Sequence, residues 1–191
     1  MADQEKDPVG TTALATKEEL RQLPIDGKTG LDIVTLGNAL AFSGFFKDAR
    51  SASQAIVKVL YGRELGIGAI ASMSSIYVFD GKTALSAHLL AALITRSQDR
   101  RYKIIEATDK ICTLRFFERE WLTVTEGSWV PVGPDITVKL DEYKHLTGKD
   151  NWRNYPSDML YARAMARGFR RYCSHLTGGV PISTPEEISD M

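Results

Sequence analysis

The part of the sequence that most constrains the fold is residues 75–117, because its apolar pattern changes from that of strands to that of a helix and back. In "SSIYVFDGKTALSA", β-branched and aromatic residues flank Asp80-Gly81, a dipeptide typical of a two-residue hairpin turn. Ser86 then begins an apolar helix, "AHLLAALITRS", and two strands follow, "YKIIEA" and "ICTLRFF". This order predicts helices interleaved with antiparallel strands.

Two helices are predicted before this segment. The apolar residues of "DIVTLGNALAFSG" recur at helical spacing and stop at Gly44. In "SASQAIVKVLYGRELG", Ser51 and Gln54 have the spacing of a capping box, and Gly66 stands where a helix ends in its C-terminal turn. We therefore expect two consecutive helices, each ended by a glycine.

The C-terminal half adds one strand and three helices. A Gly- and Pro-rich loop at residues 118–135 precedes the strand "DITVKL", and the short helix "DEYKHLTG" ends at Gly148. A longer helix runs to Tyr172, and Thr184 begins a last short one. The expected fold is α+β: a single domain with a β-hairpin and a small antiparallel sheet packed against several helices.

The expected organisation has three parts. Residues 1–30 mix Gly, Pro, Thr and charged residues, which predicts a flexible N-terminal arm. Residues 31–180 form the core, and residues 181–191 form a short C-terminal tail. A chain of 191 residues is long enough for one domain with a core and short for two.

Composition argues against a membrane protein and against a disulfide-rich one. No apolar run approaches the ~20 residues that span a bilayer, and the N-terminus "MADQEKDPVG" is unlike a signal peptide, so we expect a cytoplasmic protein. The two cysteines, Cys112 and Cys173, do not form a C-x-x-C motif, and the histidines of the chain are not clustered. Neither a disulfide nor a zinc site is therefore predicted. We expect two buried, reduced thiols.

The sequence shows no nucleotide-binding or catalytic motif. "GKT" occurs at residues 27–29 and 81–83, but a phosphate loop needs a glycine five residues before the first glycine, where Gln22 and Ile76 stand. No serine lies in G-x-S-x-G, and no pair of carboxylates stands out from solvated charge. We therefore predict a binding protein without a catalytic site, a cofactor or a metal.

Four arginines gather in one helix of a chain whose 24 basic and 24 acidic residues cancel. At about 100° per residue they fall within an arc of roughly 100°, opposite an apolar stripe. The arginines are Arg163, Arg167, Arg170 and Arg171, and the stripe is Tyr161, Met165, Phe169 and Tyr172. Arginine suits phosphate, since its planar fork donates two parallel hydrogen bonds. Two interpretations stay open: a face for an anionic ligand, or a solvated face held by carboxylates, of which the helix itself has only Asp158.

The surroundings of this helix are basic as well. Residues 139–171 hold eight basic side chains against four acidic ones, whereas both ends of the chain are acidic. Trp152 and Tyr155 precede the arginine helix, and Tyr77 and Phe79 lie in the hairpin. Basic residues interleaved with aromatic ones are typical of grooves for single-stranded nucleic acid, although core packing explains each ring taken singly at least as well.

The stretch from Leu36 to Ile188 resembles the RecT family of phage single-strand annealing recombinases. The resemblance depends on the order of its motifs: "GRELG" at a helix end, the hairpin "SIYVFDGK", an apolar helix, then "NWRNYPSDMLYARAMARGFRRYC" and "GGVPISTPEEI". It implies an ATP-independent protein of phage or prophage origin that acts in the cytoplasm of a bacterial host. Such a protein binds single-stranded DNA and the annealed duplex intermediate, and assembles as a homo-oligomer into rings or helical filaments.

Carried onto this sequence, the resemblance implies phosphate contacts for seven residues: Arg163, Arg167, Arg170, Arg171, Arg153, Lys82 and Arg63. For any one of them a salt bridge or a subunit contact is the alternative. The resemblance also implies contacts with a phage exonuclease and a host single-strand-binding protein. The alternative function is a non-annealing accessory or regulatory protein of phage origin that binds single-stranded DNA with the same fold. In both, protein contacts to the DNA backbone carry no sequence information, so specificity belongs to base pairing.

Overall fold

The computed structural model describes residues 33–49, 51–79, 82–120 and 128–189. The chain divides into two compact units, residues 1–57 and residues 58–191, and the boundary falls inside α3 (Ala52–Glu64). The first unit contains α2 (Ile33–Phe42), which ends just before Gly44, where φ is +67°. This end confirms the predicted stop, because glycine adopts positive φ without steric cost.

The second unit contains, in chain order, α4 (Ala69–Ser75), β1 (Ile76–Phe79), β2 (Lys82–Leu85), α5 (Ala87–Arg96), β3 (Arg100–Ala107), β4 (Ile111–Arg119), β5 (Trp129–Pro131), β6 (Ile136–Lys139), the 3-10 helix η1 (Leu140–Leu146), α6 (Asp150–Asn154), α7 (Pro156–Tyr172), the 3-10 helix η2 (Ser174–Thr177) and α8 (Pro185–Ser189). Helices together with antiparallel sheets of two and four strands confirm the predicted α+β class.

Local signals account for several of these boundaries. The Gln54 N–H donates to Ser51 Oγ at 3.3 Å, as expected of the N-terminus of α3. Ser86 Oγ accepts from the Leu89 N–H at 3.1 Å and caps α5. β1 and β2 pair antiparallel with Phe79 opposite Lys82, which confirms the hairpin.

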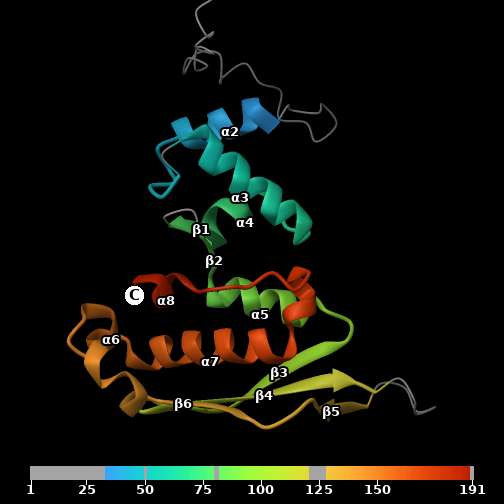
Figure 1. Ribbon diagram of the computed structural model, residues 1–191, viewed down its shortest axis with the longest axis vertical. Helices are drawn as coiled ribbons and strands as arrows, with labels where there is room; N and C mark the ends of the chain where they lie inside the picture. The colour runs from blue at the N-terminus through green and yellow to red at the C-terminus, as the bar shows by residue number, and fades with distance from the viewer. Residues whose placement is uncertain (1–32, 50, 80–81, 121–127, 190–191) are drawn as a thin grey trace, which may run out of the picture. The chain divides into compact units, whose positions relative to one another are not determined.

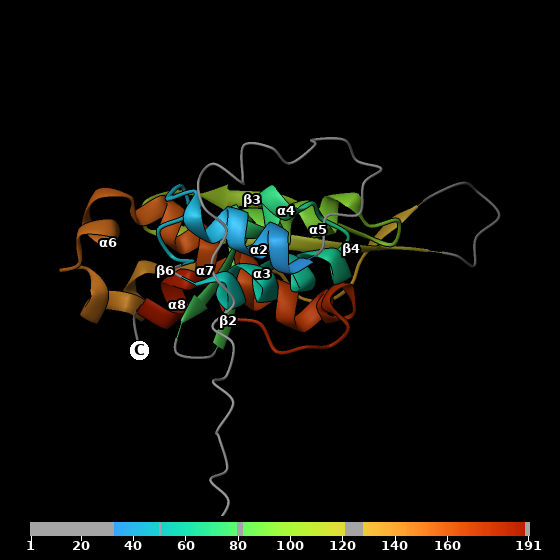
Figure 2. The same cartoon turned by 90° about the horizontal axis from the view of Figure 1, so that it is seen from above.

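The four-stranded sheet and α7 form the core of the second unit. β4 lies at the centre of the sheet, with β3 along one edge and with β5 and β6 on successive parts of the other. One face packs against α7, and α7 packs in turn against α5, so that α7 lies between the sheet and α5 (Figure 1). Both views place α6 beside the end of the sheet that β6 forms (Figure 2). Figure 1 shows no described helix of this unit on the opposite face of the sheet.

The inner face of the sheet is apolar. Cys112, Leu114 and Phe116 alternate along β4 and are at most 1% exposed, and Ile136 and Val138 of β6 are buried beside them. Because successive side chains of a strand point to opposite faces, the residues between them face outward.

Four short elements, α4, β5, α6 and η2, are absent from the sequence prediction. β5 lies inside the expected loop at 118–135 and has only three residues, too few for a periodic pattern. The expected tail at 181–191 is partly packed, since Ile182 and Thr184 are buried and Ser183 forms a bridge with Ala84 of β2.

Some expectations fall outside the described residues. They are the flexible arm at residues 1–30, the turn at residues 80–81 and the middle of the loop at residues 121–127. In the part of the chain that is described, no helix has the length and apolar character needed to cross a membrane.

Candidate nucleic-acid interface

α7, which carries the four arginines, is buried over most of its circumference because it lies between the sheet and α5. Its buried residues are Leu160, Ala162, Arg163, Ala164, Met165, Ala166, Gly168 and Phe169. Arg163, which the sequence predicts to contact phosphate, is 8% exposed and so does not lie on an open cationic face; its contact with phosphate stays a prediction. A helix packed on two sides leaves little of its surface to solvent.

Arg163 lies against two aromatic rings. Its guanidinium carbon is 5.1 Å from the ring centre of Tyr143 and 5.9 Å from that of Trp152, and these rings stack on each other with centres 5.0 Å apart. Its Nη2 also donates to the carbonyl oxygen of Glu186 at 3.2 Å. The π faces and the carbonyl stabilise the buried cation. Trp152 is thus a core residue, as core packing predicted.

Arg167 and Arg170 bind carboxylates from outside α7. Arg167 Nη2 donates to Glu142 of η1 at 2.9 Å. Arg170 donates through Nη1 and Nη2 to both oxygens of Glu187 in α8, each at 2.8 Å. Burial would raise the pKa of Glu142, but hydrogen bonds from the Lys139 N–H and from Arg167 hold it below its ordinary value of 4.5.

The interpretation of a face held by carboxylates therefore describes much of the arginine cluster, and phosphate contact stays a prediction. Arg171 is exposed near the end of α7. Arg153 of α6 is exposed and forms an ion pair with Asp150 at 2.7 Å. Lys82 is exposed on β2 and Arg63 on α3. The seven predicted residues thus lie on four different elements.

A second cationic surface lies on the face of the four-stranded sheet opposite α7, and we call it the outer sheet face. The register sets Arg101 opposite Phe117 and Lys103 opposite Arg115. Its basic residues are Arg101, Lys103, Arg115, Arg119 and Lys139, its aromatic residues are Phe117 and Trp129, and its acidic residues are Glu106 and Asp135.

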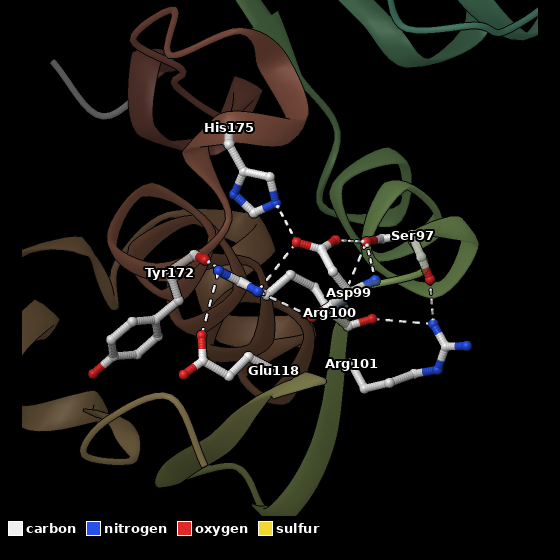
Figure 3. Close-up of polar contacts among 7 residues, drawn as sticks. All are labelled: Ser97, Asp99, Arg100, Arg101, Glu118, Tyr172 and His175. Atoms are coloured by element: carbon white, nitrogen blue, oxygen red, sulfur yellow. Dashed lines mark hydrogen bonds and ion pairs between the residues drawn. The ribbon is translucent and has the colours of Figure 1, made fainter. Parts of the chain in front are cut away.

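Arg101 and Trp129 contact each other on this face. The Arg101 guanidinium carbon lies 4.7 Å from the centre of the Trp129 ring, within the range of a cation–π interaction. Its Nη1 donates to the carbonyl oxygens of Ser97 and Arg100 at 2.6 and 3.0 Å (Figure 3), and to that of Thr95 at 3.1 Å. These bonds fix the cation above the ring.

Arg115 is the basic residue of the outer sheet face that binds a carboxylate bidentately. Its Nε and Nη2 donate to the two oxygens of Asp135 at 2.7 and 2.8 Å. The hydrogen bond from Arg115 holds the pKa of Asp135 below its ordinary value. Besides this pair, the described residues of the face include four basic side chains and one acidic side chain, Glu106, so basic residues outnumber acidic ones there.

A polar network joins the start of β3 to the end of α7 (Figure 3). Asp99 accepts from the Ser97 hydroxyl and lies 3.1 Å from both Arg100 Nη1 and His175 Nε2. Arg100 Nε donates to the Tyr172 carbonyl at 3.0 Å. Burial would raise the pKa of Asp99, but the Ser97 hydrogen bond and the Arg100 charge bring it below its ordinary value. The network holds the edge strand of the sheet against the arginine helix.

Sequence reasoning missed the outer sheet face, although a signal was present. In "RRYKI" and "CTLRFFER", basic or aromatic residues alternate with residues of the inner face, with a period of two. Of the aromatic residues considered for base stacking or core packing, Tyr77 is half-buried and Tyr155 is 60% exposed. The side chain of Phe79 lies outside the described part of the chain.

Comparison with protein-family models, with curated proteins and with solved structures finds no match for this chain. Within the described residues, no group of three or more His, Cys, Asp or Glu side chains could hold a metal ion. Cys112 and Cys173 are buried free thiols, as predicted. The candidate interface therefore rests on the geometry of this chain alone.

Proposed function

We propose that this protein binds single-stranded DNA and pairs complementary strands without ATP, acting as a homo-oligomer in the cytoplasm of a bacterial host. The proposal joins the RecT resemblance of the sequence to the outer sheet face. The observation that carries it is that basic side chains and two aromatic rings share the face of the sheet opposite α7, on which no described helix of the second unit lies. The α7 arginines carry it less well, since three of them already have partners within the fold.

The chemistry of the outer sheet face suits an unpaired strand. Lys103 and Lys139 have exposed side chains that can reach phosphates, and each phosphate contact releases condensed counterions. Phe117 and Trp129 are partly exposed and present π faces on which bases can stack. In a duplex the bases are paired and stacked on each other, so this combination favours single strands.

The mechanism is positional. Phosphate contacts hold one strand extended with its bases accessible, a second strand samples registers, and base pairing selects the product. The protein supplies neither a nucleophile nor a cofactor in this scheme. Its contribution is to raise the local concentration of one strand and to remove its self-structure.

The test is the rate at which two complementary fluorescent oligonucleotides pair without ATP. We expect the wild type to accelerate pairing and the double variant Lys103→Ala/Lys139→Ala to lose most of this acceleration. The slope of log affinity against log salt should become shallower by about 1.4, from about 0.7 for each lost phosphate contact. The double variant Lys47→Ala/Lys144→Ala makes the same change in charge outside the sheet, in the turn after α2 and in η1, and should behave as wild type.

The same experiment distinguishes the alternative. If the wild type binds single strands but does not accelerate pairing, the non-annealing accessory function replaces annealing. If it binds no single strands even at about 50 mM salt, where phosphate contacts are much stronger than at about 200 mM, the proposal fails.

A further inference from the structure

The carboxylate of Glu187 occupies an arginine site on α7. Arg170 donates to its two oxygens at 2.8 Å each, and Arg163 Nη1 lies 3.8 Å from Glu187 Oε1. The carboxylate also accepts from the Thr184 N–H at 3.0 Å. Burial would raise the pKa of Glu187, but the hydrogen bonds from Arg170 and Thr184 hold it below its ordinary value, so the group is ionised at neutral pH.

This geometry is that of an oxyanion site. Two guanidiniums, seven residues apart on one helix, converge on one pair of oxygens, and a carboxylate and a phosphate present such a pair alike. Arg163 is 9% exposed in its side chain, and besides the rings of Tyr143 and Trp152 it has the Glu187 carboxylate within 3.8 Å. The two guanidiniums together favour a negative charge at this place, and their geometry does not specify which group supplies it.

The segment that brings Glu187 to the site is joined to α7 through a glycine pair. Gly178 and Gly179 have φ values of +64° and +78°, which glycine adopts without steric cost because it has no Cβ. The contacts that hold the segment include the buried side chain of Ile182 and the bond from the Leu85 N–H to the Ser183 carbonyl at 2.9 Å. The buried side chain of Thr184 and the bond from Arg163 to the Glu186 carbonyl hold the segment as well. Displacing Glu187 therefore requires these local contacts to open while α7 and the sheet stay folded.

A solvent-open hollow adjoins the carboxylate. It is lined by Arg163, Arg170, Ile182, Ser183 and Glu187. A phosphate can therefore approach the two guanidiniums from solvent without unfolding α7 or the sheet.

We propose that Arg163 and Arg170 form a phosphate-binding site that Glu187 occupies in the ligand-free protein, and that a bound phosphate takes the place of its carboxylate. The ligand is a phosphate group, either of a nucleic-acid backbone or of a free polyphosphate. The site lies on α7 and α8 and is separate from the outer sheet face, so it goes beyond the proposed function. Only its use by DNA rests on that function.

Pyrophosphate binding by the variant Glu187→Gln tests the site. Removing the competing charge should tighten pyrophosphate binding about tenfold, because the phosphate no longer has to displace an ionised carboxylate from the two guanidiniums. Thermal unfolding at constant ionic strength measures it: pyrophosphate should raise the melting temperature of Glu187→Gln saturably and more than that of wild type. Adding Arg170→Ala to the variant should abolish the gain.

Glu142→Gln is the matched control. It removes a carboxylate from Arg167 on the same helix, and Arg167 keeps its bond to the Tyr143 hydroxyl at 3.1 Å. This variant should respond to pyrophosphate as wild type does. An equal gain in Glu142→Gln and Glu187→Gln would overturn the proposal, because it would indicate unspecific binding to basic charge.

Hydrogen exchange of the wild type covers the case in which Glu187→Gln does not fold. Pyrophosphate at saturation should speed the exchange of the Leu85 N–H, which is bonded to Ser183. Binding of pyrophosphate without faster exchange at Leu85 would overturn the proposal, because the segment that carries Glu187 would then have stayed in place.

Oligonucleotides separate the two sources of phosphate and the two proposals. If DNA uses this site, Glu187→Gln should bind single strands more tightly than wild type, in the background of intact Lys103 and Lys139. If no variant binds DNA while pyrophosphate behaves as expected, the proposed function fails and the site stands. If Lys103→Ala/Lys139→Ala loses DNA binding, but Glu187→Gln binds pyrophosphate and single strands only as tightly as the wild type does, the site fails and the proposed function stands.

Discussion

Gly168 of α7 lies so close to the ring of Phe116 in β4 that a methyl group at residue 168 would come within 2.1 Å of a ring carbon. Phe116 is 1% exposed and cannot move away without disturbing the inner face of the sheet. A glycine inside a helix costs up to about 1 kcal/mol relative to alanine. Its presence in the middle of α7 is explained by the close approach of helix and sheet that it allows.

Gly168→Ala should therefore destabilise the protein by about 1–3 kcal/mol, because overpacking against Phe116 outweighs the gain in helix propensity. Urea unfolding followed by circular dichroism measures the free energy of unfolding. Gly148→Ala is the matched control, since no atom lies within 4 Å of a methyl group built there, and its effect should stay within about 0.5 kcal/mol. Equal effects at the two positions would contradict this packing.

Much of the order of elements could be predicted because each carries a local signal. Ser86 caps α5 by accepting a hydrogen bond from the N–H of Leu89, three residues further along the chain. Gly44 and Gly66 end α2 and α3 with the positive φ that glycine favours. Such signals act within a few residues and need no knowledge of the tertiary structure. α4 and α6 lack them: neither N-cap residue, Gly68 or Lys149, makes a side-chain cap bond.

The partners of the α7 arginines could not be predicted in this way. Glu142 lies 25 residues before Arg167 and Glu187 lies 17 residues after Arg170, so a helical projection of α7 contains neither. The outer sheet face likewise depends on the register of β3 with β4, which shifts by one residue between Ile104 and Glu106. The arginine partners come from segments distant in sequence, and the outer sheet face depends on a register shift that the apolar pattern does not reveal.

The two thiols should react slowly in the folded protein. Burial raises the pKa of Cys112 to about 11 and that of Cys173 to about 12, and the thiolate is the nucleophile. At pH 8, alkylation by iodoacetamide should be slower than in the urea-unfolded chain by on the order of a hundredfold. Mass spectrometry of timed samples measures the rate for each thiol. Alkylation of either thiol at the same rate in the absence and presence of urea would contradict its burial.

Asp99 should make stability depend on pH in the acid range. Its pKa is lower in the folded protein than the ordinary 3.8, so its ionised form stabilises the fold at higher pH. That contribution is lost as the pH falls from 3.8 through the folded value. Asp99→Asn should abolish this part of the pH dependence, with an effect below about 1 kcal/mol because the side chain is one-third exposed, 34%. Unfolding curves of the wild type and of Asp99→Asn between pH 7 and about 3 measure this difference in stability. If the variant kept the pH dependence of the wild type, the role given to Asp99 would be contradicted.

Phe117 on the outer sheet face should contribute to binding of single strands through its ring. Phe117→Leu keeps an apolar side chain beside Pro131 of β5, its partner in the register, but removes the π face. Because stacking of a base on an aromatic ring is worth about 1–3 kcal/mol, the dissociation constant for an oligonucleotide should rise about tenfold. Fluorescence anisotropy at fixed salt measures it. Tyr155→Leu is the control, since Tyr155 is exposed beside α7 and away from the sheet register. Weaker binding in Tyr155→Leu with no change in Phe117→Leu would move the interface from the sheet to the start of the arginine helix.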